Sequence, residues 1–492
     1  MISTSLNEDG AVQNYVDGSW QTPSGTDGRA VRNPATGEEL AYLPFSDESD
    51  LDAAVTAANR AFDDWRQVDV EERIQPLFRF KSLLEDNIDE LATILVREHG
   101  KTVDEAKGEL RRGIENVEVA CGIPRMMQAG TLAHAAPDID ESAVREPLGT
   151  FVGITPFNFP AMISLWFLPH AIATGNTFVL KPSEQDPLVV NRIFELIDQA
   201  SFPDGVVQLV HGGPDTVNGM LEHDGIEGVS FVGSTPIARH IYETAAANGK
   251  RVQAQGGAKN HIIVTESADL DYAAEKAVSS ACACAGERCL SNDVVVVEAP
   301  IYDEFTQKMA TAMRDQTVGY GLDDGVDIGA IISPDHLETV CGYVETGLEE
   351  GATLLVDGRE VTVEGYDGNF IGPSLFAEVT PEMTIAREEH FGPIVALTAV
   401  EDFDEAVDVV NQSDYGNAAS LFTDSGHKAS RFKHEVEAGN LGVNVGTAAP
   451  MAFFSFGGRK DSFFGDLHAQ GEDMINFYTD KTSYLERWPD QR

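Results

Sequence analysis

Cys289 is the residue of this sequence whose type and setting most clearly point to chemistry. It closes the segment Ala283–Cys289, follows a helix of small residues and has Arg288 beside it. A cysteine thiolate attacks electrophilic carbon, and a permanent cation next to it favours the ionised form. Such a nucleophile normally works with a base, yet the natural place for one, at the start of Gln255–Lys259, holds an amide. A neutral amide is no general base at pH 7, so the sequence predicts a nucleophile without its usual partner.

Two strand ends have residues suited to a nucleotide. Gly233 and Ser234 follow an apolar strand, and Pro236 fits the first turn of the next helix, whose free backbone amides could receive a phosphate. The same residues also suit an ordinary strand-to-helix turn. Lys181 and Glu184 follow a second strand, at the edge where the ligand crevice of parallel sheets lies. Glu184 could accept hydrogen bonds from a ribose diol and would repel a 2′-phosphate, which favours NAD over NADP.

The elements that must position these residues change character near Gly149. Before it, periodic apolar residues predict a series of amphipathic helices, the longest over 103–127. After it, apolar runs such as 151–155 and 177–181 alternate with helical segments, and a second alternating series extends from 261 to 445. Such alternation predicts parallel sheets wound by crossover helices, in an α/β fold with two lobes.

We therefore expect a nucleotide-binding domain made of residues 1–128 and 147–256, followed by a second α/β domain over 257–463. The strand-like segments 129–146 and 464–492 fit neither lobe. We expect these two segments to form a small shared sheet that mediates oligomerisation, either in a dimer or in a tetramer.

The charge of the chain excludes several classes of partner. The 492 residues include 81 acidic and 34 basic ones, which gives a formal net charge of −47. Such a field repels nucleic acid and anionic membranes. The acidic residues are dispersed, which is typical of a solvated surface adapted to high salt, where ions screen the repulsion; an acidic docking surface is the alternative. An anionic substrate must then meet a local group of basic residues.

Neither a membrane span, nor a disulfide framework, nor a metal site is expected. No apolar run of about 18 residues is present, and residues 1–9 lack a signal pattern, which predicts a cytoplasmic protein. Five cysteines at irregular spacing do not form a disulfide framework. Cys282, Cys284 and Cys289 lie close together, but no second cysteine or histidine pair at zinc-like spacing accompanies them.

Five ordered motifs together resemble the aldehyde dehydrogenase superfamily over nearly the whole chain. They are Pro156–Pro160, Lys181–Glu184, Phe231–Ser234, Gly286–Cys289 and Glu388–Pro393. Within that superfamily the sequence is most similar to the CoA-acylating methylmalonate-semialdehyde dehydrogenases. That likeness comes from Phe157–Ile163, Val252–Ala254, Gly257–His261 and Phe453–Phe456. The resemblance implies an α/β aldehyde dehydrogenase fold with a Rossmann-type NAD-binding domain, a catalytic domain and an oligomerisation sheet.

The resemblance also implies a role for each matching residue. Cys289 attacks an aldehyde carbon, while Asn158 and the backbone N–H of Cys289 stabilise the oxyanion. Transfer of a hydride to NAD then leaves a thioester on the enzyme. The residues that match the cofactor site of the family are Phe157, Lys181, Ser183, Glu184, Gly233, Ser234, Glu389 and Phe391.

Gln255 occupies the position at which most of the superfamily have a water-activating glutamate. The implied acyl acceptor is therefore coenzyme A, whose thiol ionises more readily than water. The resembling group usually has asparagine at this position and glutamine at that of Glu287, so Glu287 adds a carboxylate next to the nucleophile. A hydrolytic aldehyde dehydrogenase that activates water with Glu287 or Glu389 is the alternative, and a non-catalytic binding protein is a third hypothesis.

Arg112 and Arg288 are the expected contacts for a substrate carboxylate. Arg112 matches the substrate arginine of the resembling family, and a guanidinium pairs bidentately with a carboxylate; an ion pair on a helix surface is its alternative role. A β-carboxylate on the aldehyde would leave as carbon dioxide after oxidation, so the implied products are propionyl-CoA or acetyl-CoA. One methyl group separates methylmalonate from malonate semialdehyde, and it changes pocket fit by only about 1 to 3 kcal/mol.

Overall fold

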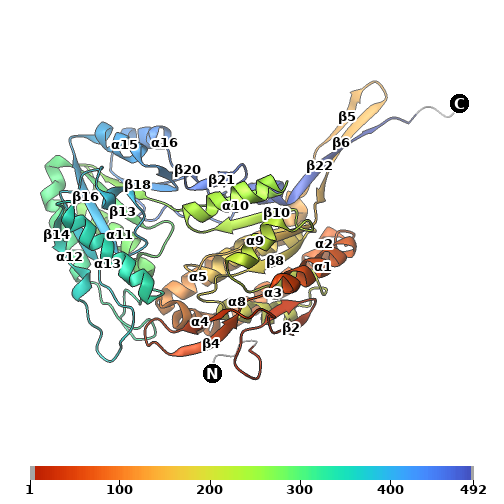
Figure 1. The fold of residues 1–492 in the computed structure, drawn as a ribbon. Helices are drawn as coiled ribbons and strands as arrows, with labels where there is room; N and C mark the ends of the chain where they lie inside the picture. The colour runs from red at the N-terminus through yellow and green to blue at the C-terminus, as the bar shows by residue number, and fades with distance from the viewer. Residues whose placement is uncertain (1–5, 489–492) are drawn as a thin grey trace.

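The computed structural model describes residues 6–488, so the outer ends of the expected domain ranges, 1–5 and 489–492, lie outside the described residues. Two large sheets with their helices form two lobes, and a narrow β-arm projects from the first lobe (Figure 1). The expected α/β fold class is confirmed. Over residues 6–488, no helix combines the length and the apolar character that crossing a bilayer requires.

The first lobe is built on an eight-stranded sheet in the order β2-β1-β9-β8-β7-β10-β11-β21. Its strands are β1 (Asn14–Val16), β2 (Ser19–Gln21), β7 (Thr150–Ile154), β8 (Thr177–Lys181), β9 (Val207–Leu209), β10 (Gly228–Val232), β11 (Arg251–Gln255) and β21 (Phe463–Gly465). The five strands from β9 to β11 pair in parallel, and the remaining three are antiparallel. The nucleotide-binding strand ends expected from the sequence therefore lie along one edge of this sheet.

Helices cover this sheet and connect its parallel strands. They are α1 (Glu48–Trp65), α2 (Val70–Arg73), α3 (Gln75–Asp86), α4 (Ile88–His99), α5 (Val103–Cys121), α6 (Ile123–Met126), α7 (Pro160–Ala173), α8 (Leu188–Ala200), α9 (Pro214–Glu222) and α10 (Thr235–Ala247). The expected single helix over 103–127 is interrupted at Gly122, because Pro124 lies in the first turn of α6. Proline there has no N–H to continue the ladder of α5.

Helix α7 is the centre of the first lobe. Apolar residues surround it on all sides, and every residue except Met162 is buried, as expected for a helix without a polar face. It packs against α5 and against the first sheet. The turn that leads into α7 contains Asn158, so this buried helix fixes that residue relative to the sheet.

The second lobe is built on a seven-stranded sheet in the order β14-β15-β16-β13-β12-β18-β19, parallel except for β14. Its strands are β12 (Asn260–Val264), β13 (Asn292–Glu298), β14 (Thr353–Val356), β15 (Ser374–Ala377), β16 (Ile394–Val400), β18 (Ala418–Phe422) and β19 (Asn440–Val443). Its helices are α11 (Leu270–Cys282), α12 (Tyr302–Arg314), α13 (Pro334–Glu349), α14 (Thr384–Arg387), α15 (Phe403–Gln412) and α16 (Gly426–Glu435), with 3-10 turns at Ala283–Gly286, Ala299–Ile301 and Gly358–Glu360. Two small ribbons pair β3 (Gly28–Arg32) with β4 (Glu39–Pro44) and β17 (Tyr415–Gly416) with β20 (Arg459–Lys460).

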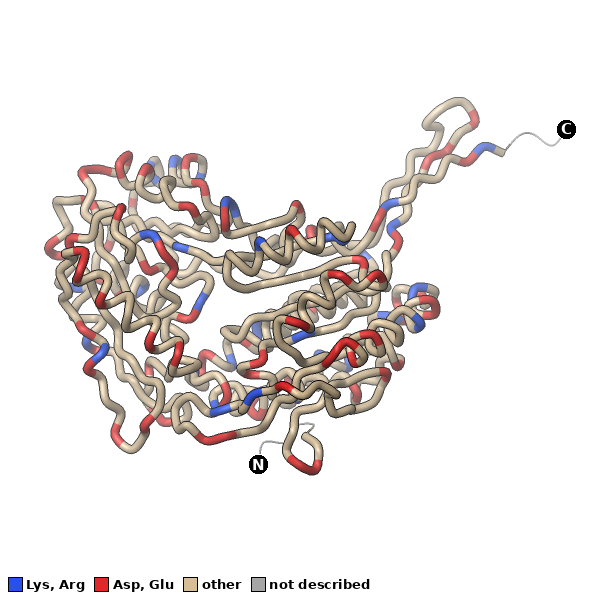
Figure 2. Tube along the Cα trace, in the orientation of Figure 1, with Lys and Arg blue, Asp and Glu red and all other residues tan. Residues whose placement is uncertain are grey.

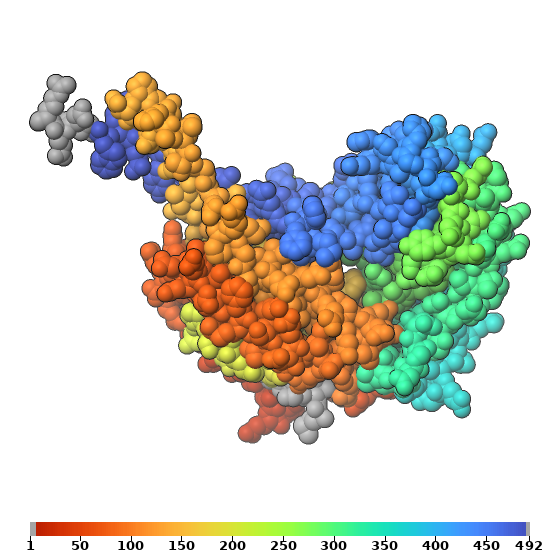
Figure 3. All heavy atoms as spheres, turned by 180° about the vertical axis from the view of Figure 1, so that it is seen from behind, coloured from red at the N-terminus to blue at the C-terminus, as the bar shows by residue number. Residues whose placement is uncertain are grey.

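The projecting arm is an antiparallel sheet in the order β22-β6-β5, with β5 (Thr131–Ala136), β6 (Ile139–Pro147) and β22 (Thr479–Glu486). Seen from behind, it extends well beyond the body of the molecule (Figure 3). The segments 129–146 and 464–492 do contribute its strands. The expectation that the second segment is strand-like throughout is wrong, because α17 (Gly471–Tyr478) precedes β22 and buries Met474 and Ile475 against the first lobe.

Acidic residues are spread over both lobes rather than gathered on one face (Figure 2). Many of them are exposed, and several cap helices, as Asp47 does when its carboxylate accepts hydrogen bonds from the backbone N–H groups of Ser49 and Asp50 at the start of α1. The dispersed pattern agrees with a solvated acidic surface and gives no single acidic docking face.

Candidate active site

Cys289 lies where two cavities meet. The larger of the two, about 700 Å³, lies over the edge of the first sheet. The smaller, about 480 Å³, lies between α5, α7 and the segment around Pro450. The lining of the larger cavity includes residues from four segments, 154–158, 181–185, 231–237 and 389–391. The lining of the smaller cavity includes Arg111, Arg112, Phe159, Met162, Trp166, Arg288, Phe456 and Gln470. One side chain thus faces both spaces, as a nucleophile between a cofactor and a substrate would.

The turn before Cys289 is tightly held. Gly286 has a φ of +78°, and a Cβ there would come within 2.2 Å of the Gly392 carbonyl carbon, so only glycine fits. The backbone N–H of Cys284 donates to Glu105 of α5 over 2.6 Å. At the other end, the Cys289 carbonyl oxygen accepts hydrogen bonds from two carboxamides, Asn260 at 2.9 Å and Asn417 at 2.7 Å. Both lobes therefore fix the backbone of the nucleophile.

Burial controls the ionisation of Cys289. It raises the pKa of the thiol to about 11, because a thiolate is poorly solvated in this partly buried position. The Arg288 guanidinium opposes that shift, and the Glu389 carboxylate adds to it. The sequence-based expectation that Arg288 favours the thiolate is therefore right in direction, but burial outweighs it, and the resting thiol is protonated at pH 7.

Asn158 lies in the loop between β7 and α7, two residues before the helix begins, and lines the larger cavity together with Cys289. It is 4% exposed, yet its carboxamide makes no hydrogen bond to any described residue. The backbone N–H of Cys289 has no carbonyl partner among them either. Two free donors beside a nucleophile form the arrangement that stabilises an oxyanion.

Gln255 is the last residue of β11, at the same edge of the sheet. Its side chain is buried, and neither the amide oxygen nor the amide nitrogen has a hydrogen-bond partner among the described residues. Its backbone oxygen accepts a hydrogen bond of 3.1 Å from the N–H of Gly233, which ties it to the turn after β10. The residue at this place is neutral, and its amide has no partner among the described residues. Like Glu287, it is not among the residues that line the two cavities around Cys289, so its role toward the acyl-enzyme stays a prediction.

All eight cofactor candidates line the larger cavity: Phe157, Lys181, Ser183, Glu184, Gly233, Ser234, Glu389 and Phe391. Lys181 ends β8, and its ammonium lies 3.0 Å from the Glu184 carboxylate, which lowers the pKa of Glu184 despite a burial effect that raises it. A Cβ on Gly233 would meet the Phe231 ring at 2.4 Å, so a side chain cannot fill this cradle. Ser234 precedes α10 without capping it through its side chain, which leaves amides of the first turn free.

Glu389 and Phe391 belong to the second lobe and close the larger cavity from that side. The Glu389 carboxylate accepts a hydrogen bond of 3.0 Å from the Ala258 N–H, while burial raises its pKa to about 7. The Phe391 ring lies 5.7 Å from the Phe157 ring in an edge-to-face contact. The two lobes thus contact each other through residues that also line the cavity.

Arg112 and Arg288 both line the smaller cavity, next to Cys289. The Arg288 side chain has no hydrogen bond or ion pair with any described residue, so its charge is available to a ligand. Arg112 is partly engaged: it pairs with Glu115 at 2.6 Å and donates to the Pro450 carbonyl. The helix ion pair expected as the alternative role of Arg112 is therefore present, while its contact with a substrate carboxylate stays a prediction.

Glu287 lies next to Arg288 in sequence but lines neither of the two cavities. Its carboxyl group is fully buried, accepts a hydrogen bond of 3.2 Å from the Ile332 N–H, and lies 3.7 Å from the imidazole of His336. Burial raises its pKa well above the usual value, which disfavours the carboxylate. Glu287 thus does not line the cavity surfaces that Cys289 shares, although its neighbour His336 lines the larger one.

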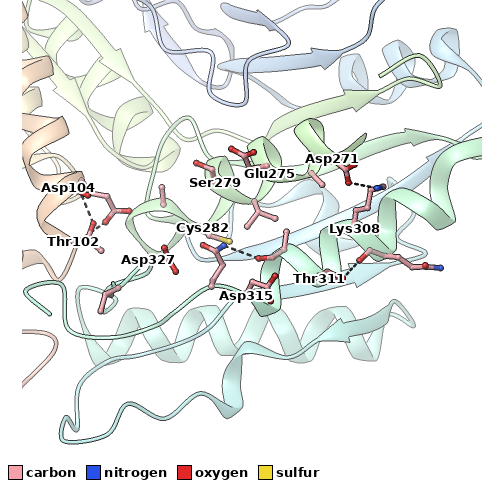
Figure 4. A pocket seen from close by; sticks show the side chains of 18 of the residues that line it. Thr102, Asp104, Asp271, Glu275, Ser279, Cys282, Lys308, Thr311, Asp315 and Asp327 are labelled. Atoms are coloured by element: carbon pink, nitrogen blue, oxygen red, sulfur yellow. Dashed lines mark hydrogen bonds and ion pairs between the residues drawn. The ribbon is translucent and has the colours of Figure 1, made fainter. Parts of the chain in front are cut away.

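Another cavity lies away from Cys289. It measures about 820 Å³ and is lined by Thr102, Asp104, Asp271, Glu275 and other residues of α11 and α12 (Figure 4). Acidic side chains dominate it, with Lys308 bound to Asp271, and neither Cys289 nor Asn158 reaches it. Over residues 6–488, no group of three or more His, Cys, Asp or Glu side chains is arranged to hold a metal ion.

Several residues of the site were not foreseen from the sequence. Trp166 lies four residues after Met162 on α7, and both line the smaller cavity, so helical spacing could have indicated this. Gln470 also lines it, is buried, and has a φ of +65° with an unpartnered amide oxygen. No pattern in the sequence distinguishes Gln470. Nor does any distinguish Asn417, which binds the nucleophile's carbonyl.

Comparison with known proteins agrees with this geometry. A model of the aldehyde dehydrogenase family matches residues 20–483. A malonate-semialdehyde dehydrogenase of Halalkalibacterium halodurans is 47% identical over 477 residues, which cover 97% of this chain and 98% of that protein. The crystal structure of a methylmalonate-semialdehyde dehydrogenase of Oceanimonas doudoroffii superposes with a TM-score of 0.96 at 42% identity, covering 98% of this chain and 99% of that one. A Sinorhizobium meliloti 1021 protein complexed with NAD and described as a methylmalonate-semialdehyde dehydrogenase gives a TM-score of 0.96 at 40% identity, with 98% of each chain covered.

Proposed function

Because this chain belongs to the aldehyde dehydrogenase family, we propose that it oxidises malonate semialdehyde or methylmalonate semialdehyde with NAD and transfers the acyl group to coenzyme A. The substrates after which its relatives are named support the substrate class. The acyl acceptor is supported by Gln255, a neutral residue at the end of β11, because it matches the sequence position at which most of the superfamily have a water-activating glutamate.

NAD fits the larger cavity. The free amides at the start of α10 and the open cradle at Gly233 suit a diphosphate, and Glu184 suits a ribose diol while repelling a 2′-phosphate. When bound, NAD accepts a hydride from the substrate carbon. Glu389 and Phe391 would hold its nicotinamide half beside Cys289, because both line the cavity at that end.

The first chemical step forms a bond between the Cys289 sulfur and the aldehyde carbon. The carbonyl oxygen becomes an oxyanion, which the Asn158 carboxamide and the Cys289 N–H stabilise as donors. Arg288 favours loss of the thiol proton against the effect of burial. Loss of a hydride from the substrate carbon then leaves a thioester on Cys289.

The second step discharges this thioester. Hydrolysis needs a base to take a proton from water, and Gln255 has no lone pair basic enough. Glu287, the other carboxyl near the nucleophile in sequence, is directed to Ile332 and His336. The thiolate of coenzyme A attacks without such help, so the acyl group leaves as a thioester of coenzyme A and the Cys289 sulfur is regenerated.

The substrate carboxylate binds in the smaller cavity, near Arg112 and Arg288. Once the aldehyde carbon has become a thioester, the β-carboxylate loses carbon dioxide because the thioester carbonyl accepts the electron pair. Malonate semialdehyde then gives acetyl-CoA, and methylmalonate semialdehyde gives propionyl-CoA. The oxidation and the decarboxylation together convert one aldehyde, one thiol and NAD into acyl-CoA, carbon dioxide and NADH.

We also propose how the protein assembles and in which compartment and salt conditions it works. The arm formed by β5, β6 and β22 exposes Leu132, Leu485 and Trp488, which suits contact with further copies in a homotetramer. All five cysteines are free thiols, as is usual in the cytoplasm. The dispersed acidic surface suits a protein that works in concentrated salt.

Assay of the purified protein with and without coenzyme A tests the proposal. We expect NADH formation from malonate or methylmalonate semialdehyde in concentrated salt to continue for many turnovers only when the thiol is present. Without it, NADH formation should stop after about one equivalent per active site. Sustained production of free acid without coenzyme A would contradict the proposed acyl acceptor, and absence of aldehyde-dependent NADH would contradict the oxidation itself.

A further inference from the structure

Lys101 and Glu109 form an ion pair that the mechanism above leaves without a role. Their side chains are fully buried, and the Lys101 ammonium lies 2.5 Å from a Glu109 carboxylate oxygen. Burying two charges is costly unless both are paired and hydrogen-bonded. Burial alone would lower the pKa of Lys101, but the Glu109 carboxylate raises it above its usual value, so the ammonium stays charged. Such a pair next to an active site calls for an explanation.

Lys101 contacts the turn that holds the oxyanion donor. Its ammonium donates to the backbone carbonyl of Asn158 over 2.7 Å and lies 4.6 Å from the centre of the Phe159 ring. The Asn158 carboxamide itself makes no hydrogen bond to any described residue, so its position depends on this backbone. A buried, charged donor therefore fixes the backbone of Asn158. Lys101 itself lines neither of the two cavities around Cys289.

Glu109 holds the other end of the same turn. Its second oxygen accepts hydrogen bonds from the N–H groups of Ala161 at 2.9 Å and Met162 at 3.1 Å. These are free donors of the first turn of α7, and the residue before that helix, Phe159, has no side chain able to cap it. A carboxylate at a helix N-terminus is favourable, so Glu109 supplies from α5 the cap that the local sequence lacks.

One face of α5 combines these contacts with the nucleophile. Glu105 precedes Glu109 by one helical turn and binds the Cys284 N–H, while Arg112 follows by a further turn. All three residues line the smaller cavity. The same helix face therefore contacts the turn of the oxyanion donor, the turn of the nucleophile and the expected substrate carboxylate.

We propose that Lys101, held by Glu109, is a positioning residue that sets the orientation of Asn158 for oxyanion stabilisation; this inference rests on the proposed aldehyde oxidation. Lys101 touches neither substrate nor cofactor. It acts by fixing the Asn158 carbonyl and the start of α7, so that the carboxamide needs no reorganisation when the oxyanion forms.

A double-mutant cycle between Lys101→Met and Asn158→Ala tests the proposal. We expect each single variant to slow the first-turnover formation of NADH, Asn158→Ala by about 10²- to 10³-fold and Lys101→Met by about 30-fold. If Lys101 acts through Asn158, the double variant should be no more than about 2-fold slower than Asn158→Ala alone. Multiplied effects, or a Lys101→Met variant at the wild-type rate, would overturn the proposal.

Two further measurements separate positioning from general damage. Alkylation of Cys289 by iodoacetamide needs a correctly folded nucleophile turn but no oxyanion donor, so Lys101→Met should retain it within about 3-fold while losing NADH formation. Equal losses in both would indicate a structural role only. Lys107→Met is the matched control, because Lys107 lies on α5 close to Glu109 in sequence but pairs with Asp89 at the surface, and its rates should equal those of the wild type.

If Lys101→Met does not fold, Glu109→Gln replaces it in the cycle, since glutamine keeps an oxygen for the Ala161 N–H. We expect Glu109→Gln to slow NADH formation by no more than about 2-fold when it is added to Asn158→Ala. If the effects of the two substitutions multiply, the proposal is overturned. A wild-type protein that forms no NADH with any aldehyde would instead contradict the proposed function. That result is distinct from every outcome of the cycle.

Discussion

The carboxamide of Asn417 donates a hydrogen bond of 2.7 Å to the carbonyl oxygen of Cys289. Asn417 lies between β17 and β18 of the second lobe, far from the nucleophile in sequence. Asn260, at the start of β12, donates to the same oxygen at 2.9 Å. The strands of the second sheet thus determine where the Cys289 backbone lies, and with it the N–H that faces the oxyanion.

Replacement of Asn417 by alanine should therefore lower turnover more than it lowers substrate affinity. Loss of one of the two bonds lets the Cys289 backbone shift, and a misplacement of about 1 Å costs on the order of 10² in rate. We expect kcat to fall by about 10- to 100-fold with KM nearly unchanged, measured as NADH formation under saturating coenzyme A. Asn411→Ala is the matched control, because that carboxamide also binds a carbonyl, the one of Glu435, but far from Cys289.

Replacement of Arg288 by methionine should remove the preference for carboxylated aldehydes. A charged hydrogen-bonded pair contributes about 1.5–3 kcal/mol, so kcat/KM for methylmalonate semialdehyde should fall about 10- to 100-fold relative to that for propanal. Arg111→Met serves as the control, since Arg111 is exposed on the same cavity. A preference ratio that stays at the wild-type value in Arg288→Met would contradict the carboxylate site.

The ionisation of Cys289 predicts a specific pH dependence. Burial raises the pKa of the thiol to about 11, so the thiolate fraction of the cofactor-free enzyme should rise about tenfold for each pH unit between 7 and 10. Alkylation by iodoacetamide, followed by mass spectrometry of the Cys289 peptide, should follow that slope. Arg288→Met should react more slowly at each pH, because the guanidinium favours the thiolate. A rate that is already constant near pH 7 would show a thiolate activated in the resting enzyme.

Much of the site could be predicted because its residues lie at strand ends. Lys181, Gly233 and Gln255 follow or end neighbouring parallel strands, so distant motifs meet at one edge of the sheet. Lys101 and Glu109 could not be predicted in the same way. Lys101 lies in the short connection before α5 and Glu109 on α5 itself, where charged residues ordinarily indicate a solvated surface, and only the packing of the first lobe buries them.

The sequence also does not show which of two opposing effects on the pKa of Cys289 is the stronger. The proximity of Arg288 to Cys289 indicates the direction of one influence on the thiol, but the extent of burial depends on the whole fold and decides the outcome. Helix α17 shows the same limit in another form. Met474, Ile475, Phe477 and Tyr478 have helical spacing, yet the neighbouring strand-like residues of the tail concealed it.

Replacing Gln470, which lines the smaller cavity, by glycine should stabilise the folded protein. Its backbone has a φ of +65° and a ψ of 170°, a region that residues other than glycine adopt at a cost of about 1–3 kcal/mol. Its buried amide oxygen also lacks a partner. Gln470→Gly should therefore raise the midpoint of thermal unfolding, measured by scanning fluorimetry in the same salt. Gln199→Gly, in the regular last turn of α8, should lower it, and an equal decrease in both variants would contradict the strain at Gln470.

Restoring a carboxylate at the end of β11 provides the most direct test of the acyl acceptor. In Gln255→Glu, burial should raise the pKa of the new carboxyl toward neutrality, which suits a base that activates water at pH 7 to 8. We expect free-acid formation without coenzyme A to increase at least about 10-fold over the wild type, measured as sustained NADH formation with acid analysed by chromatography. Glu287→Gln should leave the dependence on coenzyme A unchanged, because the Glu287 carboxyl already accepts a hydrogen bond from the Ile332 N–H and lies 3.7 Å from the His336 imidazole. The opposite pattern would be strict dependence on coenzyme A in Gln255→Glu and an altered dependence in Glu287→Gln. In that case Glu287 governs discharge of the acyl-enzyme, and the role argued for Gln255 is wrong.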